Sequence, residues 1–142
     1  MFVKLFEIVE NMHHQVNSFD NSKNRYLDTY SGEFYDEEEY EALPECVKSD
    51  IIQIPKSDWR TAAEDFLEVY FNTKRRLQFK EKFSVKDSDF GSFWSEMARN
   101  RLDWEWRRFY ADFIFEKAKK WCKENGIHYT DNFHPYEKKF AL

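Results

Sequence analysis

Glu10, His13 and His14 lie near the end of an expected N-terminal helix, and their side-chain types bind metal ions in many proteins. Glu10 and His14 are spaced i, i+4, so they share one helical face and offer one oxygen and one nitrogen ligand. No third ligand is identifiable, and adjacent histidines point about 100° apart around a helix. We therefore predict surface or capping histidines and no metal site. His128 and His134 lack an evident partner for a catalytic triad.

Three other patterns argue against enzymatic chemistry. Cys46 and Cys122 are isolated cysteines, which favours reduced thiols. Cys122 could act as a nucleophile only with a base nearby, so we predict that it is a small buried thiol on a helix face. Asp36–Glu39 places four carboxylates in a row without the spaced ligands of a calcium loop, so we predict a solvated acidic segment. The chain has 3 scattered glycines, which exclude a phosphate-cradling loop. We predict no catalytic residue and no cofactor.

The strongest candidate for a functional surface is basic and aromatic. Residues 74–108 hold 10 basic and 6 acidic side chains in a chain of net charge −5. Arginines position phosphates and exposed aromatic rings stack on bases, while Trp and Arg are also enriched at protein interfaces. Nearby carboxylates such as Glu96 offer local ion-pair partners instead. The residues predicted to contact nucleic acid or a protein partner are Lys74, Arg75, Arg76, Arg99, Arg101, Trp104, Arg107 and Arg108.

Charge is unevenly distributed along the chain. Residues 1–56 hold 5 basic and 12 acidic side chains, a net charge of −7, whereas residues 57–127 hold 15 basic and 13 acidic ones, a net charge of +2. Such polarity can steer a partner, but a solvated surface is the simpler explanation and the one that we favour.

The first third of the chain predicts a helix followed by a small sheet. Apolar residues at i, i+3, i+4 and i+7 indicate a helix over residues 3–14. A strand over residues 25–29, a turn at Gly32 and a return strand from Phe34 form a hairpin. The acidic run predicts a short helix, and the β-branched residues 50–54 predict a third strand that Pro55 closes.

The rest of the chain predicts helices. One begins at Thr61 or earlier, at Ser57 or Asp58, and buries a stripe over residues 63–71. A second follows a cap at Asn72 or Thr73, and a third holds Phe90–Met97. The last helix spans residues 104–125, has Asp103 as a fair N-cap and ends at Gly126 in a left-handed conformation. The aromatic residues expected to pack against the 63–71 stripe are Trp106, Phe109, Phe113 and Trp121.

The C-terminal half also carries a recognisable pattern of aromatic residues and a helix stop. The matching positions are Phe90 and Phe93, Leu102, Trp106 and Phe109, Ala118 and Trp121, and Asn125-Gly126-Ile127. In the N-terminal half they are Val3-Lys4-Leu5, Tyr26-Leu27-Asp28, Ser31-Gly32-Glu33 and Ile52-Gln53-Ile54-Pro55.

Over residues 3–129 this pattern resembles uncharacterised protein family 0158 (UPF 0158), a group of small bacterial proteins of unknown biochemical role. The chain departs from it at Ser88-Asp89, where the family often has Gly-Ala, and at Tyr110-Ala111, where it often has Arg-Asp. The resemblance implies a bacterial protein and an expectation for the fold, with almost no functional content.

These patterns together predict an α+β fold, with a small antiparallel sheet from residues 25–54 beside four or five helices. We expect one domain over residues 1–127, with a helix and sheet in 1–56 and helices in 57–127, then an extended tail over 128–142. The chain shows neither a signal peptide nor the roughly 20 apolar residues that span a bilayer, which predicts a cytoplasmic protein without membrane contact.

Three classes of function fit these predictions. The leading one is a non-enzymatic cytosolic protein-interaction or regulatory module with a protein partner. The first alternative is a nucleic-acid-associated regulator that uses residues 74–108, and the second is an enzyme whose site is assembled only in three dimensions. An exposed apolar patch would favour the first class, a continuous basic stripe the second, and a pocket with convergent ionisable groups the third. The sequence predicts neither the partner's identity nor the oligomeric state.

Overall fold

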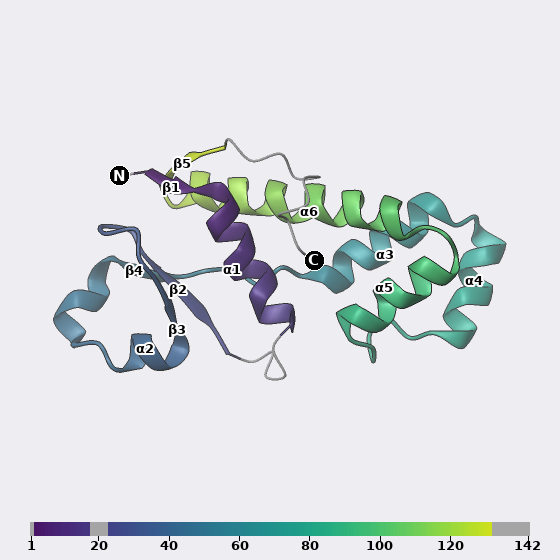
Figure 1. Cartoon of the computed structure of the whole chain (residues 1–142), viewed down its shortest axis with the longest axis horizontal. Coiled ribbons are helices and arrows are strands. Elements are labelled where there is room, and N and C mark those ends of the chain that lie inside the picture. Colours follow the sequence, from purple (N-terminus) through teal and green to yellow (C-terminus); the bar gives the residue numbers. More distant parts are fainter. Residues whose placement is uncertain (1, 18–22, 132–142) are drawn as a thin grey trace. The chain divides into compact units, whose positions relative to one another are not determined.

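The computed structural model describes residues 2–17 and 23–131 and confirms an α+β fold (Figure 1). Its described residues fall into two compact units. The first unit comprises residues 2–57 and 114–131, and the second comprises residues 58–113. The long helix α6, Asp103–Glu124, contributes its first half to the second unit and its second half to the first.

The first unit begins with a strand that the sequence analysis did not predict. Strand β1, Phe2–Lys4, leads directly into helix α1, Leu5–Asn17, so the prediction of a helix from residue 3 was wrong by two residues. Strand β5, His128–Thr130, pairs with β1 in parallel, with Phe2 opposite His128 and Lys4 opposite Thr130. The predicted extended tail over residues 128–142 therefore starts with a paired strand, and its residues 132–142 lie outside the described part of the chain.

A second sheet confirms the predicted hairpin and third strand. Its order is β3-β2-β4, with β2 at Arg25–Asp28, β3 at Phe34–Asp36 and β4 at Ile51–Gln53, all antiparallel. Gly32 takes a φ of 82° in the connecting turn, a region that glycine enters without a steric cost. The N–H of Gly32 donates to the carbonyl of Asp28 at 2.8 Å, which closes the turn.

The acidic run folds as the short helix α2, Glu37–Glu41, followed by a 3-10 helix at Glu45–Asp50. Asp36 caps α2, because its carboxylate accepts from the backbone N–H of Glu39 at 2.8 Å. The Glu39 carboxylate in turn accepts from the N–H of Asp36 at 3.0 Å, which completes a capping box. The local sequence thus explains why the three glutamates that follow Asp36 are helical.

Three helices and the start of α6 form the second unit. They are α3 at Trp59–Tyr70, α4 at Thr73–Lys82 and α5 at Phe90–Arg99. Helix α3 begins after Asp58, so the earlier of the two predicted starts is right. Asn72 caps α4 and Asp89 caps α5, each accepting from a backbone N–H three residues later, at 2.8 and 2.7 Å.

The two units bury different kinds of side chain. The apolar residues buried in the first unit are mainly aliphatic: Val3, Leu5, Ile8, Val9, Met12, Leu27, Ile51, Ile54, Ile114, Phe115, Ala118 and Cys122. In the second unit the buried set is largely aromatic, and its larger members are Trp59, Phe66, Leu67, Phe71, Phe90, Phe93, Met97, Trp106 and Tyr110.

The indole of Trp106 lies at the centre of the aromatic core. Its ring centroid is 4.8 Å from that of Phe93 and 5.4 Å from that of Phe66, both in edge-to-face geometry. The predicted joint burial of four aromatic residues of α6 is right only in part. Trp106 is fully buried, but Phe109, Phe113 and Trp121 are half-buried, and Trp121 belongs to the first unit.

The buried face of α6 is rotated by about one residue from the predicted stripe. Apolar residues occur in runs of two or three along this helix, at 109–111, 113–115 and 121–122, so the sequence pattern did not decide which member of each run faces inward. The face that is buried consists of Trp106, Tyr110, Ala111, Ile114, Phe115, Ala118 and Cys122.

Candidate interaction surface

Helix α4 is attached to the second unit through few apolar contacts. None of its side chains is buried. Its main anchor is half-buried Phe79, whose ring centroid lies 5.4 Å from that of Phe71 and 5.3 Å from that of Phe83. Leu77 is 60% exposed on the same helix. Helix α4 therefore presents basic side chains and one large apolar side chain to solvent.

The first turn of α4 is tied to the end of α5 by Arg75. Its guanidinium stacks over the ring of Phe71, 4.2 Å from the centroid, and donates to the Asn100 side-chain carbonyl at 3.1 Å. Lys74 is exposed beside it, and Arg76 is half-buried. These contacts place the basic residues of α4 next to the turn that joins α5 to α6.

Arg101 occupies an unusual backbone position in that turn. Its φ is 58°, in the left-handed region that glycine favours and that costs other residues roughly 1 kcal/mol. Its N–H donates to the carbonyl of Ala98 at 3.0 Å, and the N–H of Leu102 donates to that of Met97 at 2.8 Å. This is the Schellman pattern that ends a helix, with an exposed arginine in the position of the usual glycine.

The start of α6 adds a tryptophan and two arginines. Trp104, Arg107 and Arg108 are spaced i, i+3 and i+4, so they share one face of the helix. Trp104 is 50% exposed, and the guanidinium carbon of Arg107 lies 6.0 Å from its ring centroid. Arg107 is half-buried and Arg108 is exposed. Trp106 points inward, so the structure separates the two neighbouring tryptophans into a surface role and a core role.

All eight predicted contact residues lie in the second unit, on α4, at the end of α5, in the turn after α5 and on the start of α6. Within this set Arg99 forms an ion pair with Glu96, which offsets its charge. Nearby on α4, Lys80 pairs with Glu64 of α3 at 2.8 Å.

Sequence reasoning missed the exposure of Leu77, although its strongly polar neighbours were a signal for it. We call Lys74, Arg75, Arg76, Leu77, Arg99, Arg101, Trp104, Arg107 and Arg108 the basic surface.

The structure describes part of the histidine cluster. His13 is buried in α1, so the prediction of a surface or capping histidine is wrong for this residue, and Glu10 is exposed. The side chain of His14 and all of His134 lie outside the described part of the chain. Within residues 2–17 and 23–131, no three His, Cys, Asp or Glu side chains are grouped so as to hold a metal ion. In the same residues, no helix is sufficiently long and apolar to cross a bilayer.

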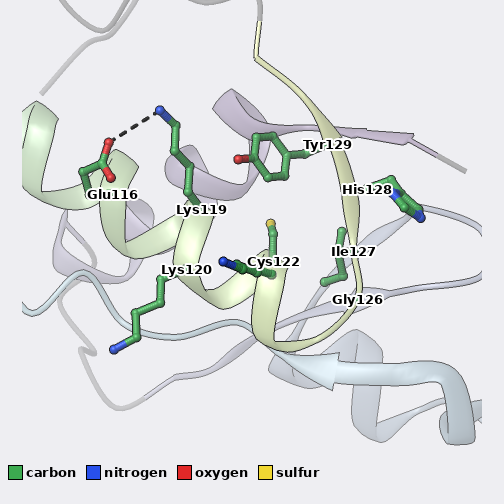
Figure 2. Close-up of a pocket in the computed structure, with 9 residues that line it drawn as sticks. Glu116, Lys119, Lys120, Cys122, Gly126, Ile127, His128 and Tyr129 are labelled. Atoms are coloured by element: carbon green, nitrogen blue, oxygen red, sulfur yellow. Dashed lines mark hydrogen bonds and ion pairs between the residues drawn. The ribbon is translucent and has the colours of Figure 1, made fainter.

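An open concavity of about 550 Å³ lies in the first unit, between the end of α6 and β5 (Figure 2). Figure 2 shows the Cys122 thiol and the Tyr129 ring on the α6 side of β5, while His128 points away from them. Burial raises the pKa of the Cys122 thiol to about 11, so it stays protonated at neutral pH. Cys122 is fully buried, as predicted, and the concavity offers no activated nucleophile.

No protein-family model matches the chain, and neither a curated protein nor a solved structure matches it. The functional interpretation therefore depends on the geometry of the two units.

Proposed function

We propose that this protein is a non-enzymatic, cytosolic interaction module that binds an acidic protein partner through the basic surface of its second unit. Arg101 carries the proposal. Arg101 is exposed and has a left-handed backbone conformation, in which glycine would have no steric cost. The arginine therefore places a positive charge at this position at a cost in stability. Strained backbone positions of this kind occur preferentially at functional sites.

The composition of the basic surface supports a protein as the partner. Trp104 and Leu77 offer exposed apolar area, and Arg75 is held in place by Phe71 and Asn100 before any partner arrives. Tryptophan and arginine contribute disproportionately to the energy of protein interfaces, and pre-ordered side chains lose less entropy on binding. The resemblance to UPF 0158 remains a proposal as well, supported by the aromatic pattern that ends at Gly126.

A comparison of surface variants by quantitative affinity capture tests this proposal. Leu77→Ser with Arg101→Gln and Arg108→Gln should lose a specific protein that the wild-type chain retains after nuclease treatment. The matched control changes the first unit, with Val47→Ser, Lys4→Gln and Lys56→Gln. Val47 is likewise exposed, at 45% of its surface, and the charge change is equal. Equal retention by both variants would contradict a role for the basic surface.

Single-stranded nucleic acid is the second candidate, because a half-exposed Trp104 beside Arg107 and Arg108 resembles a base-stacking platform. In this case affinity should fall steeply with salt, with a logarithmic slope of about −0.7 per neutralised phosphate. Changing Arg75, Arg76, Arg107 and Arg108 to Gln should flatten that slope. If no binding is detected at about 50 mM salt, where electrostatic binding is strong, the nucleic-acid candidate is excluded.

A further inference from the structure

Strand β5 in the first unit has one strand neighbour among the described residues. Its partner is β1, and the two form a two-stranded parallel sheet. An edge strand presents backbone N–H and C=O groups that can pair with another extended chain. His128 and Thr130 are exposed, so within the part of the chain that the structure describes β5 lies at the surface of its unit.

The concavity lies on the α6 side of β5. Ile127, His128 and Tyr129 line it, and the Tyr129 ring lies on this side while His128 points away (Figure 2). Strand β1 occupies one edge of β5. Because successive side chains of a strand point to opposite faces, a strand added at the other edge would turn every second side chain toward the concavity.

The opposite wall of the concavity is a row of lysines on α6. Lys119, Lys120 and Lys123 line it, together with the single acidic residue Glu116. Lysines near a helix C-terminus also offset the negative end of the helix dipole, so this charge alone does not identify a ligand. The strand edge beside the lysines is the second, independent feature that points to one.

The ion pairs of these lysines are weakly held and can be exchanged. Lys119 contacts Asp131 at 3.3 Å and Glu116 at 3.5 Å, and Lys120 contacts Glu124 at 3.9 Å. Burial lowers the pKa of Lys119, but Asp131 and Glu116 outweigh it and hold this pKa above its ordinary value, so the Lys119 side chain remains charged at neutral pH.

We propose that this groove binds an extended acidic segment of another protein, which pairs with the edge of β5 as an added strand. Main-chain hydrogen bonds to β5 would supply affinity, and alternate side chains would supply specificity. Because side chains alternate along a strand, the segment should carry acidic residues at every second position, facing the lysines. The residues between them then lie on the face of His128, and they should be β-branched, which favours an extended strand. This site is separate from the basic surface and extends the proposed function to a second contact.

Three labelled heptapeptides test the proposal by fluorescence anisotropy. Thr-Glu-Val-Glu-Val-Glu-Thr should bind. Thr-Glu-Pro-Glu-Pro-Glu-Thr has the same charge but lacks two backbone donors, so it should bind at least about tenfold more weakly. Thr-Lys-Val-Lys-Val-Lys-Thr should not bind, because it opposes the lysine wall. Equal binding of the valine and proline peptides would overturn strand addition, and equal binding of the lysine peptide would overturn the charge preference.

Two charge-matched variants locate the peptide. Lys120→Gln with Lys123→Gln should weaken binding of the glutamate–valine peptide about three- to tenfold. Lys74→Gln with Lys82→Gln changes the same charge on α4 and should leave this affinity unchanged, with circular dichroism confirming that both variants fold. If only the α4 variant weakens binding, the groove proposal fails while the proposed function of the basic surface gains support. If both proposals are right, the peptide and the captured partner respond to different variants.

Amide hydrogen exchange distinguishes the proposed occupant from a second copy of this chain. In a monomeric protein the peptide should slow exchange at the amides of β5 whose N–H groups point away from β1, which occur at every second residue. Self-association in sedimentation velocity, with the same slowing before peptide is added, would mean that another copy fills the edge and would overturn the proposal.

Discussion

Helices α5 and α6 end with the same hydrogen-bond pattern but with different residues in the left-handed position. At the end of α5 the N–H of Leu102 donates to Met97, and at the end of α6 the N–H of Ile127 donates to Cys122, both at 2.8 Å. Asn100 and Asn125 precede these positions, and each side-chain amide donates four residues back, at 2.8 and 2.9 Å. The next residue, which takes the left-handed conformation, is Arg101 after α5 and Gly126 after α6.

At the end of α6 the residue type suits the left-handed backbone, whereas at the end of α5 an arginine is present in spite of it. Gly126 has a φ of 65° and Arg101 a φ of 58°, so both backbones are left-handed. Glycine takes this conformation without a steric cost, and arginine takes it at roughly 1 kcal/mol. The end of α6 is therefore optimised for stability, whereas the end of α5 keeps an exposed cation at a cost in stability. Arg101 lies within the surface predicted to bind a partner.

The two cores differ as well, and the largest predicted effect lies in the aromatic one. Trp106→Ala should destabilise the protein by about 3–5 kcal/mol, because it removes a fully buried indole that contacts Phe66 and Phe93. Trp104→Ala is the matched control and should cost under about 1 kcal/mol, since half of that side chain is exposed. Urea unfolding monitored by circular dichroism measures both, and similar losses for the two variants would contradict the assignment of core and surface.

The next effect concerns the glycine at the end of α6. Gly126→Val should cost about 1–2 kcal/mol, because a β-branched residue resists a positive φ. A Cβ at this position meets no atom within 4 Å, so backbone strain is the sole expected cause. Gly91→Ala is the control in α5, where a Cβ would lie 3.7 Å from an Asp89 oxygen, an ordinary contact. An unchanged unfolding midpoint for Gly126→Val would mean that the two helix ends do not differ in strain.

The converse change at the end of α5 should stabilise. Arg101→Gly should raise stability by about 0.5–1 kcal/mol, because glycine removes the cost of the left-handed conformation. The same variant should bind the captured partner more weakly than wild type. The midpoint of urea unfolding and the amount of captured partner are measured on the same preparation of the variant. A lower midpoint would indicate that Arg101 is kept for a structural contact and would remove the main support for the proposed function.

The smallest effect is a pH dependence at the start of α5. The hydrogen bond from the backbone of Ser92 holds the pKa of Asp89 below its ordinary value of 3.8. A carboxyl whose pKa is lower in the folded state stabilises above the unfolded pKa, and this contribution is lost as pH falls through the folded pKa. Asp89→Asn keeps a capping oxygen that does not titrate. Wild type should therefore lose stability relative to this variant below about pH 4, and parallel curves in acid denaturation would contradict the assigned cap.

Local signals predicted most elements of the fold. The hairpin follows from Gly32 between two apolar runs, the start of α2 follows from the acidic run, and the start of α4 follows from the capping side chain of Asn72. These signals act over a few residues, so they do not require knowledge of the tertiary structure. The eight predicted contact residues were likewise identified from charge and aromatic content, which can be counted in the sequence without knowledge of the fold.

What the sequence left undecided depends on contacts between distant segments. Strands β1 and β5 have three residues each and pair from opposite ends of the described chain, so neither has a local pattern that reveals it. The groove beside β5 was therefore not predicted either. Arginine has no preference for a left-handed backbone, so nothing in the sequence indicated the conformation of Arg101.

The sequence by itself determined the helices, the antiparallel sheet, the helix stop at Gly126 and the supply of cations and aromatic rings in residues 74–108. Only the tertiary structure decided that Trp106 is buried while Trp104 is exposed, that Arg75 bridges to Asn100, and that β5 lies beside a row of lysines. The physical reason is the separation along the chain over which each interaction acts. Propensity, capping and glycine conformation act between near neighbours, whereas burial, ion pairing and strand edges depend on which distant segments meet.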